Sequence, residues 1–289
     1  MTNRHYDNIA GFLEDVRATV IEQFPDQREY FDIYANEALF GFSIIETEIN
    51  QLQPGSAIME VGAGLLLLSG YLASKGMKIH ALEPIAGGFS HFRELQKAVI
   101  KHYEKIGVKL NLIDTPIERF SLTECFDYVY SINVFEHIVD VEHGLSNAYL
   151  SLRHGGILRV YCPNYHFPYE PHFNIPTLFD KRLTEIVFRS SIESSQMPYA
   201  KDTWDALNWI NVSQVRRLFR QHFDNAPLFN RLATYQIVSR VLCDPQFMAR
   251  RSKWLSTLLQ SLDSMEMLKL FKFFPIRLAP VMDFNIRRN

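Results

Sequence analysis

The 289-residue chain has 47% hydrophobic residues, 21% charged residues and a formal net charge of −2, so it can bury a large core and has no global attraction to nucleic acid or an anionic membrane. Its three scattered cysteines form no Cys-x-x-Cys pair, which argues against a disulfide framework and a thiolate metal site. No apolar run approaches the roughly 20 residues of a membrane span, and the first ten residues are too polar for a secretory leader. We therefore expect a reduced, soluble, cytoplasmic protein.

The first 53 residues precede the predicted sheet and form two predicted helices. Apolar residues recur at helical spacing from Ile9 to Val20, and Pro25 ends this pattern. A second apolar run covers residues 30–52 and stops before a Pro-Gly pair. Residues 1–53 are therefore predicted to be an N-terminal helical cap. A lid over a pocket and a cover for one face of the sheet both fit its aromatic content.

The stretch from residue 57 to Glu83 has the order strand, glycine turn, helix, strand and acid. The apolar run Ala57–Val61 predicts a buried strand, and the turn Gly62–Gly64 lets the backbone approach a ligand closely. A helix over 65–74 and a strand over 77–82 then lead to Glu83. This order predicts the nucleoside-binding half of a doubly wound sheet, with Glu83 binding two ribose hydroxyls.

The glycine turn does not suit a dinucleotide. A dinucleotide fingerprint needs a third small residue where Leu67 stands. The charge of Glu60 inside the strand would repel a phosphate, whereas it suits the cationic amino-acid end of a ligand. The pattern Glu60-x-Gly62-x-Gly64 resembles motif I of the class I S-adenosylmethionine (SAM) methyltransferases, which reads Glu/Asp-x-Gly-x-Gly.

The next elements extend this resemblance. A helix is predicted over 89–103, and a third strand over 108–113 ends at Asp114. In these methyltransferases a polar residue just past the third strand pairs with the adenine amino group, a role that the resemblance gives to Asp114. A cap of the turn before the next proline is the alternative role. The loop Ile85–Gly88 could let the backbone pass close to the adenosine.

The most specific match begins at the fourth predicted strand, residues 126–132. This strand starts with Phe-Asp-x-Val and is followed by Glu136–Ile138, Glu-His-Ile, a signature of the methyltransferase group that includes the ubiquinone-pathway O-methyltransferases. The resemblance covers about residues 55–165, including a fifth strand over 156–162, and implies that Asn133 lies by the methionine end of the cofactor. The residues expected at the cofactor are Glu60, Gly62, Ala63, Gly64, Glu83, Pro84, Asp114, Thr115, Asn133 and Val134.

The loop after the fifth strand, residues 163–176, places tyrosine, histidine, glutamate and asparagine side chains between prolines. Ligands of open α/β sheets bind beyond the carboxyl ends of the strands, and prolines restrict the backbone of such a loop. His166 or His172 is chemically suited to remove a proton from a hydroxyl acceptor, and Tyr165 and Tyr169 could orient that acceptor. Bracing the loop through hydrogen bonds is the alternative role of each side chain.

A metal is a separate question for the same region. Small-RNA 3′-end methyltransferases resemble it and hold Mg²⁺ with Glu-x-x-Glu-His and a later histidine. Here Asn133 replaces the first glutamate, while Glu136, His137 and His172 stand at the other positions. Mg²⁺ prefers hard oxygen ligands, and the loss of a charged one weakens such a site. We therefore expect no metal, with Glu136, His137 and His172 as the alternative ligand set and the start of the next helix as the commoner role of the Glu-His pair.

The last part of the chain carries two predicted helical insertions, at residues 177–211 and 235–278. Within the second, leucines at i, i+3, i+4 and i+7 stand beside basic residues over 250–274. This pattern could seat the segment on a membrane surface or a protein partner, and covering core is the alternative. Between the insertions, the sequence predicts a helix with Ser213 as its N-cap.

The sequence thus predicts an α/β fold, a Rossmann-like, seven-stranded, mostly parallel doubly wound sheet, over residues 54–289. The last two strands are expected over 223–232 and 281–286. The resemblance implies a SAM-dependent methyltransferase whose partner is a small-molecule, sugar or lipid-linked acceptor, methylated at oxygen, and no nucleic acid is expected. The alternatives are a SAM-binding module without turnover and an NAD-dependent or nucleotide-sugar-dependent Rossmann enzyme. The acceptor and the oligomeric state are left open.

Overall fold

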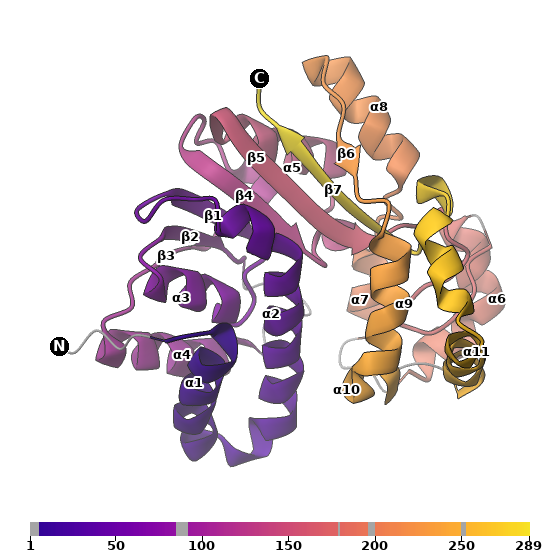
Figure 1. Cartoon of the computed structure of the whole chain (residues 1–289), viewed down its shortest axis with the longest axis horizontal. Helices are drawn as coiled ribbons and strands as arrows, with labels where there is room; N and C mark the ends of the chain where they lie inside the picture. The colour runs from indigo at the N-terminus through magenta and orange to yellow at the C-terminus, as the bar shows by residue number, and fades with distance from the viewer. Residues whose placement is uncertain (1–5, 85–91, 179, 196–199, 250–252) are drawn as a thin grey trace. The chain divides into compact units, whose positions relative to one another are not determined.

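The computed structural model describes residues 6–84, 92–178, 180–195, 200–249 and 253–289 (Figure 1). The predicted adenosine loop, Ile85–Gly88, and residues 250–252 of the predicted partner segment, which include Arg250 and Arg251, lie outside these ranges. The chain divides into two compact units. The first contains Met1–Val134, Glu142–Arg159 and Arg287–Asn289, and the second contains Phe135–Val141 and Val160–Ile286.

A seven-stranded sheet has the strand order β3-β2-β1-β4-β5-β7-β6. Strand β1 pairs in parallel with β2 and β4, β2 pairs in parallel with β3, and β6 pairs antiparallel with β7. The predicted mostly parallel Rossmann-like sheet is therefore confirmed. The strands are β1 (Ala57–Val61), β2 (Lys78–Leu82), β3 (Asn111–Ile113), β4 (Phe126–Ile132), β5 (Leu152–Pro163), β6 (Leu228–Phe229) and β7 (Val281–Arg287).

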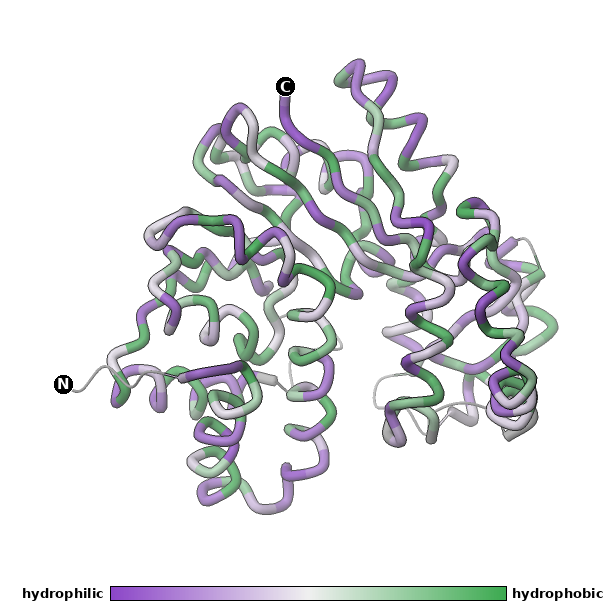
Figure 2. The backbone as a smooth tube through the Cα atoms, viewed as in Figure 1, coloured by the Kyte–Doolittle hydropathy of each residue, from purple (hydrophilic) through white to green (hydrophobic). Residues whose placement is uncertain are grey.

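In the first unit, the N-terminal helices and the helices that connect β1, β2 and β3 lie on one side of these strands (Figure 1). Helix α1 contacts α3 and α4, and α2 contacts α3. Phe12 of α1 is fully buried against the rings of Tyr71 and Tyr103. Hydrophobic and hydrophilic residues alternate along α2 (Figure 2), as expected of a helix with one buried face. The helices are α1 (Ile9–Gln23), α2 (Arg28–Ile49), α3 (Leu67–Ser74) and α4 (Phe92–Ile106), and α5 (Val141–Leu150) follows β4.

The second unit has its own helical core. Val238, Val241, Phe247, Leu259 and Leu268 form a buried cluster contributed by α9, α10, α11 and the 3-10 helix η5. The predicted leucine stripe thus packs largely inside this unit, and its contact with a membrane or partner stays a prediction. These elements are α6 (Lys181–Glu193), α7 (Ala200–Ala206), α8 (Val212–Phe223), α9 (Ala233–Cys243), α10 (Pro245–Ala249), α11 (Lys253–Ser264) and η5 (Met267–Phe273).

Among the described residues, no helix combines the length and the apolar character that crossing a membrane requires.

Several predicted boundaries are wrong, and three of them have a clear structural cause. Strand β5 begins at Leu152, before residue 156, because Gly155 donates to the carbonyl of Arg288 at 2.8 Å near the C-terminus. Helix α8 begins one residue before Ser213, since the side chain of Asn211 caps it by accepting from the N–H of Gln214 at 3.0 Å. Strand β6 has two residues instead of ten, because α8 continues to Phe223.

The packing of α3 against α4 gives a test of the first unit. A Cβ on Gly70 would lie 2.2 Å from the phenol of Tyr103, whose hydroxyl donates to the carbonyl of Leu66 at 2.9 Å. We expect Gly70→Ala to lower the free energy of unfolding by about 1–3 kcal/mol, measured by urea denaturation. In the matched control, Gly11→Ala, the nearest atom lies 3.7 Å away, and we expect neutrality or a gain of up to about 1 kcal/mol. Equal effects of both variants would contradict this packing.

Candidate functional site

The turn after β1 is shaped by a glycine that no other residue can replace. Gly62 has φ +77°, a region that favours glycine. A Cβ there would lie 2.3 Å from a methyl group of Val134, just past β4. The N–H of Gly62 donates to the carbonyl of Leu82 at 2.8 Å, and the N–H of Ala63 donates to the same atom at 3.1 Å. The turn is thereby fixed against the ends of β2 and β4.

Glu83 holds the next position of the turn. Its Oε2 accepts the N–H of Gly64 at 2.6 Å, and no described residue donates to its Oε1. Burial raises the pKa of Glu83 to about 7. The hydrogen bond from the Gly64 N–H lowers this pKa, and the charge of Asp114 raises it. Gly64 has φ +52°, and the position of a Cβ there is open space. The turn therefore offers one carboxylate oxygen and an unobstructed backbone to a ligand.

Glu60 is buried in β1 behind this turn. Its carboxylate accepts a hydrogen bond from the hydroxyl of Ser69 in α3. Burial raises the pKa of Glu60 to about 7; the hydroxyls of Ser69 and Tyr130 lower it, and the charge of Glu83 raises it. Glu60 is thus a buried acid whose charge is coupled to that of Glu83.

The other residues predicted at the cofactor lie at the ends of β2, β3 and β4 in the same unit. Pro84 is half-buried directly after Glu83. Asp114 is exposed, and the N–H of Thr115 donates to the carbonyl of Ile113 at 3.0 Å. Asn133 is exposed with φ +55°, which asparagine tolerates better than most residues.

Gln96 was missed by sequence reasoning. It is buried in α4, and its Nε2 donates to the carbonyl of Gly64 at 2.8 Å. The glycine turn is therefore held at its N–H by Glu83 and at its C=O by Gln96. The available signal was an amide on the apolar face of a predicted helix, where a polar side chain needs a partner.

In the second unit, the turn Phe135–His137 follows β4 and is held by Asn208, which sequence reasoning also missed. The Nδ2 of Asn208 donates to the carbonyls of Phe135 at 2.5 Å and Ile138 at 2.7 Å. Its backbone N–H donates to the carbonyl of Glu136 at 2.9 Å. These bonds fix the backbone on both sides of Glu136 and His137.

Glu136 and His137 are both shielded from solvent. The Glu136 side chain is fully buried, and no other described residue donates a hydrogen bond to either of its carboxylate oxygens. Burial raises the pKa of Glu136 to about 7, although the charge of His172 lowers it. The pKa of His137 is lowered to about 3 by burial and by the charges of His172 and Lys181. An unpaired buried carboxylate is costly, so this geometry is not what stability alone would select.

His172 belongs to the loop after β5 and is oriented by a buried acid. Its Nδ1 lies 2.6 Å from Oε1 of Glu170, whose Oε2 accepts the N–H of Phe173 at 2.7 Å. Burial alone raises the pKa of Glu170, but the His172 ring and the backbone N–H groups of Phe173 and His172 outweigh it and lower the pKa. Backbone bonds between Glu170 and Ile175 close the loop. Glu170 is thus a further functional candidate.

The other predicted side chains of this loop have different surroundings. Tyr165 is buried and stacked on Trp209 at 5.3 Å, and its hydroxyl donates to Glu170 at 3.3 Å. The hydroxyl of Tyr169 donates to Asn174 at 2.5 Å. Burial and the charge of Arg277 lower the pKa of His166, and no described residue bonds to its buried Nδ1. Hydrogen bonds therefore brace the loop at both tyrosines.

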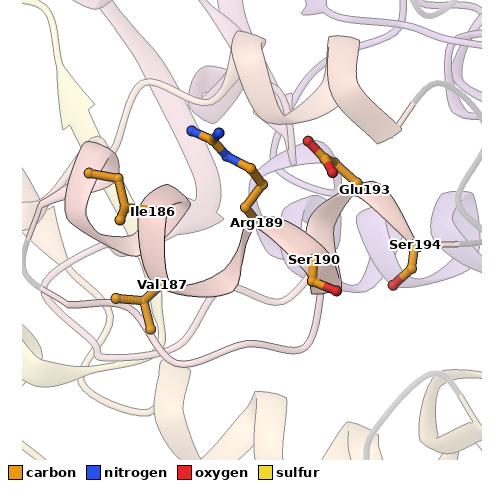
Figure 3. Close-up of a pocket in the computed structure, with 6 residues that line it drawn as sticks. All are labelled: Ile186, Val187, Arg189, Ser190, Glu193 and Ser194. Atoms are coloured by element: carbon orange, nitrogen blue, oxygen red, sulfur yellow. The ribbon is translucent and has the colours of Figure 1, made fainter.

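The loop and the turn bring three predicted residues together. Glu136, His137 and His172 each offer a ligand atom within 4.8 Å of those of the other two, and the two imidazole rings lie 5.2 Å apart. The six residues that line a surface pocket on α6, from Ile186 to Ser194 (Figure 3), include none of the predicted site residues.

The chain is similar to known proteins in sequence and in fold. A family described as a methyltransferase domain matches residues 59–160. An uncharacterized protein of Mycobacterium tuberculosis strain H37Rv is 36% identical over 279 residues, which cover 96% of this chain and 94% of that protein. A ubiquinone biosynthesis O-methyltransferase of Rickettsia typhi is 27% identical over 110 residues, 38% of this chain and 40% of that enzyme.

One solved structure illustrates the shared fold. Phosphoethanolamine N-methyltransferase 2 of Haemonchus contortus, in complex with S-adenosyl-L-methionine, superposes with a TM-score of 0.52 at 15% identity over 88% of this chain. This chain spans 52% of that one, about half its length.

The raised pKa of Glu60 predicts how stability depends on pH. Between pH 4.5 and about 7, folded ligand-free protein keeps a proton on Glu60 that the unfolded chain releases, so its stability falls as the pH rises. Glu60→Gln cannot titrate. We expect the unfolding free energy of the variant relative to wild type to increase from pH 5 to pH 8, by on the order of 1–3 kcal/mol.

Urea denaturation at several pH values measures this difference. Glu94→Gln, at an exposed position in α4, is the matched control and should show a difference that does not change with pH. A Glu60→Gln difference that is constant or shrinks toward pH 8 would overturn the assignment.

Proposed function

This chain belongs to the class I SAM-dependent methyltransferase superfamily, and we propose that it methylates an oxygen atom of a small-molecule, sugar or lipid-linked acceptor. SAM is the cofactor of this superfamily. When bound, it would supply a methyl group on a sulfonium: the nucleophilic acceptor atom would bond to the methyl carbon in line as the carbon–sulfur bond breaks and the sulfur leaves as a neutral thioether. The tasks left to the protein are to hold the cofactor, to align the acceptor and to take up a proton from it.

The glycine turn fits the cofactor. Because the backbone at Gly64 borders open space and Oε1 of Glu83 has no described donor, we assign Glu83 to the two ribose hydroxyls. Gly62 and Ala63 supply backbone in close approach, and Glu60 supplies a negative charge for the amino-acid end of the cofactor. All four residues, Glu60, Gly62, Ala63 and Glu83, belong to the first unit and are held by contacts within it.

The remaining assignments follow the strand ends. Asp114 and Thr115, past β3, are proposed to lie at the adenine, with Pro84 beside the ribose. Asn133 and Val134, past β4, are proposed to lie at the methionine end. Val134 also packs against the Gly62 turn, so a change in the position of either residue would displace the other.

The cluster of Glu136, His137 and His172 is the single observation that favours an oxygen acceptor. A hydroxyl holds its proton tightly at neutral pH and needs help to lose it, whereas an amine can act as a nucleophile once deprotonated by solvent. Two imidazoles and a carboxylate lie within 4.8 Å of one another in this cluster, an arrangement that suits the handling of a proton.

Among the loop side chains, His172 is the best supported acceptor-side group because Glu170 fixes its ring. His166 is the second candidate for the base. Tyr165 and Tyr169 are proposed to position the loop and the acceptor, since their hydroxyls already donate to Glu170 and Asn174.

The cofactor assignment predicts the effect of removing one carboxylate. We expect Glu83→Ala to weaken SAM binding by about tenfold to a hundredfold, because hydrogen bonds to a charged group contribute about 1.5–3 kcal/mol each. Isothermal titration calorimetry with SAM measures this change, and thermal unfolding of the free variant checks that it is folded. Glu94→Gln should bind as wild type does. A loss below threefold in folded Glu83→Ala would contradict the assignment.

The acceptor assignment predicts a different pattern for His172→Ala. SAM affinity should stay within about twofold of wild type, while turnover falls by about 10²–10⁴-fold, the range for lost proton-transfer catalysis. Tritiated SAM with a panel of phenols, hexoses, prenylated phenols and primary amines identifies the acceptor class. Transfer to amines with none to hydroxyls would reject the oxygen assignment, and equal losses of SAM binding in Glu83→Ala and His172→Ala would reject the division of roles.

A further inference from the structure

We propose that Glu136, His137 and His172 bind one divalent transition-metal ion of the Zn²⁺ class through two imidazole nitrogens and one carboxylate. The inference goes beyond the proposed function, because metal binding can be tested whichever acceptor is methylated. With Nδ1 paired to Glu170 and Nε2 on the ion, His172 cannot also take up a proton. The base role assigned to His172 therefore applies to the metal-free chain, and His166 is the candidate base when the ion is bound. All three residues and the groups that hold them belong to the second unit, so the site is built within one compact body.

The first argument is the state of the Glu136 carboxylate. It is fully buried, no other described residue donates a hydrogen bond to it, and its Oε1 lies 4.0 Å from Nε2 of His137. Buried carboxylates are ordinarily paired, hydrogen-bonded or bound to a metal. A cation between Glu136 and the two imidazoles satisfies this carboxylate with ligand atoms already at hand.

The second argument is the distance among the ligand atoms. They lie within 4.8 Å of one another. Tetrahedral zinc with bonds of about 2.1 Å places neighbouring ligand atoms about 3.4 Å apart, so binding requires a modest inward movement. His172 is the ligand best able to make it, since its side chain is 25% exposed and lies on a loop.

The third argument is the support behind each ligand. Nδ1 of His172 pairs with Glu170 at 2.6 Å, which assigns Nε2 to the ion. Histidine ligands of metals are commonly oriented by a carboxylate in this way. Glu170 is itself anchored by the N–H of Phe173. On the other side, Asn208 holds the backbone of Glu136 and His137.

The donor set selects the class of metal. Imidazole nitrogens suit Zn²⁺ and its transition-metal neighbours, whereas Mg²⁺ needs a shell of hard oxygens. Glu136 is the one carboxylate of the cluster, because Glu170 is engaged by His172 and Phe173. Three protein ligands leave a coordination position for water or another small ligand, as in catalytic zinc sites.

Titration of the chelator-stripped full chain with ZnCl₂ tests the proposal by calorimetry and by competition with a chromophoric chelator. We expect one saturable equivalent per chain, and Mg²⁺ should bind at least about a hundredfold more weakly. His172→Ala and the isosteric Glu136→Gln should each weaken Zn²⁺ binding by more than about a hundredfold. Glu170→Gln, which acts through His172, should weaken it by about tenfold to a hundredfold.

His154→Ala, at an exposed histidine of the first unit, is the matched control and should bind Zn²⁺ as wild type does. Circular dichroism checks the fold of each variant, and the visible spectrum of the Co²⁺-loaded wild-type chain reports tetrahedral nitrogen and oxygen ligands without any variant. Absence of a saturable equivalent, a Co²⁺ spectrum that is octahedral, or Zn²⁺ affinity unchanged in folded His172→Ala and Glu136→Gln would overturn the proposal. Mg²⁺ binding as tight as Zn²⁺ binding would overturn the metal class. Hydroxyl methylation by the stripped enzyme would leave the proposed function standing.

Discussion

The hydrogen bond from the N–H of Gly64 to Glu83 is the constraint on which the proposed cofactor site depends. At 2.6 Å it joins the turn after β1 to the end of β2, and Gln96 holds the carbonyl of the same glycine from α4. Gly62 lies against Val134 with no room for a Cβ. The turn can therefore present its backbone to a ligand only while β2, β4 and α4 are in place. The motif is local in the sequence, but its geometry depends on tertiary contacts.

The sequence was sufficient for the elements whose signals are local. Strands β1 and β4 match their predicted bounds residue for residue, because each is an apolar run that ends in a sharp turn. Strand β5 was predicted too short, without its first residues, Leu152 to Gly155. They are extended because the chain near Arg288, more than 130 residues away, pairs with Gly155 and Gly156. Pairing at that separation leaves no local signal.

The chemistry of the loop after β5, the proposed acceptor side, could also be predicted only in part. Each histidine of the loop looked equally suitable in the sequence, and the structure separates them through Glu170, which pairs with His172 at 2.6 Å. Comparison with the Glu-x-x-Glu-His motif predicted no metal, because Asn133 replaces a carboxylate. The motif does not report the burial of Glu136 or the short distance between the His137 and His172 rings, since both arise only when the turn after β4 and the loop after β5 fold together.

Asn208 ties the segment between β5 and α8 to the Phe135–His137 turn, and this has a consequence for how related enzymes diverge. That segment resembles a surface addition to a common sheet, yet its asparagine holds the Phe135–His137 turn through both the side chain and the backbone. Exchange of the segment between relatives would therefore also exchange the geometry of a turn more than 60 residues earlier in the chain. Recombination of this one segment could then change the acceptor preference, while the glycine turn and the Glu83 carboxylate stay unchanged.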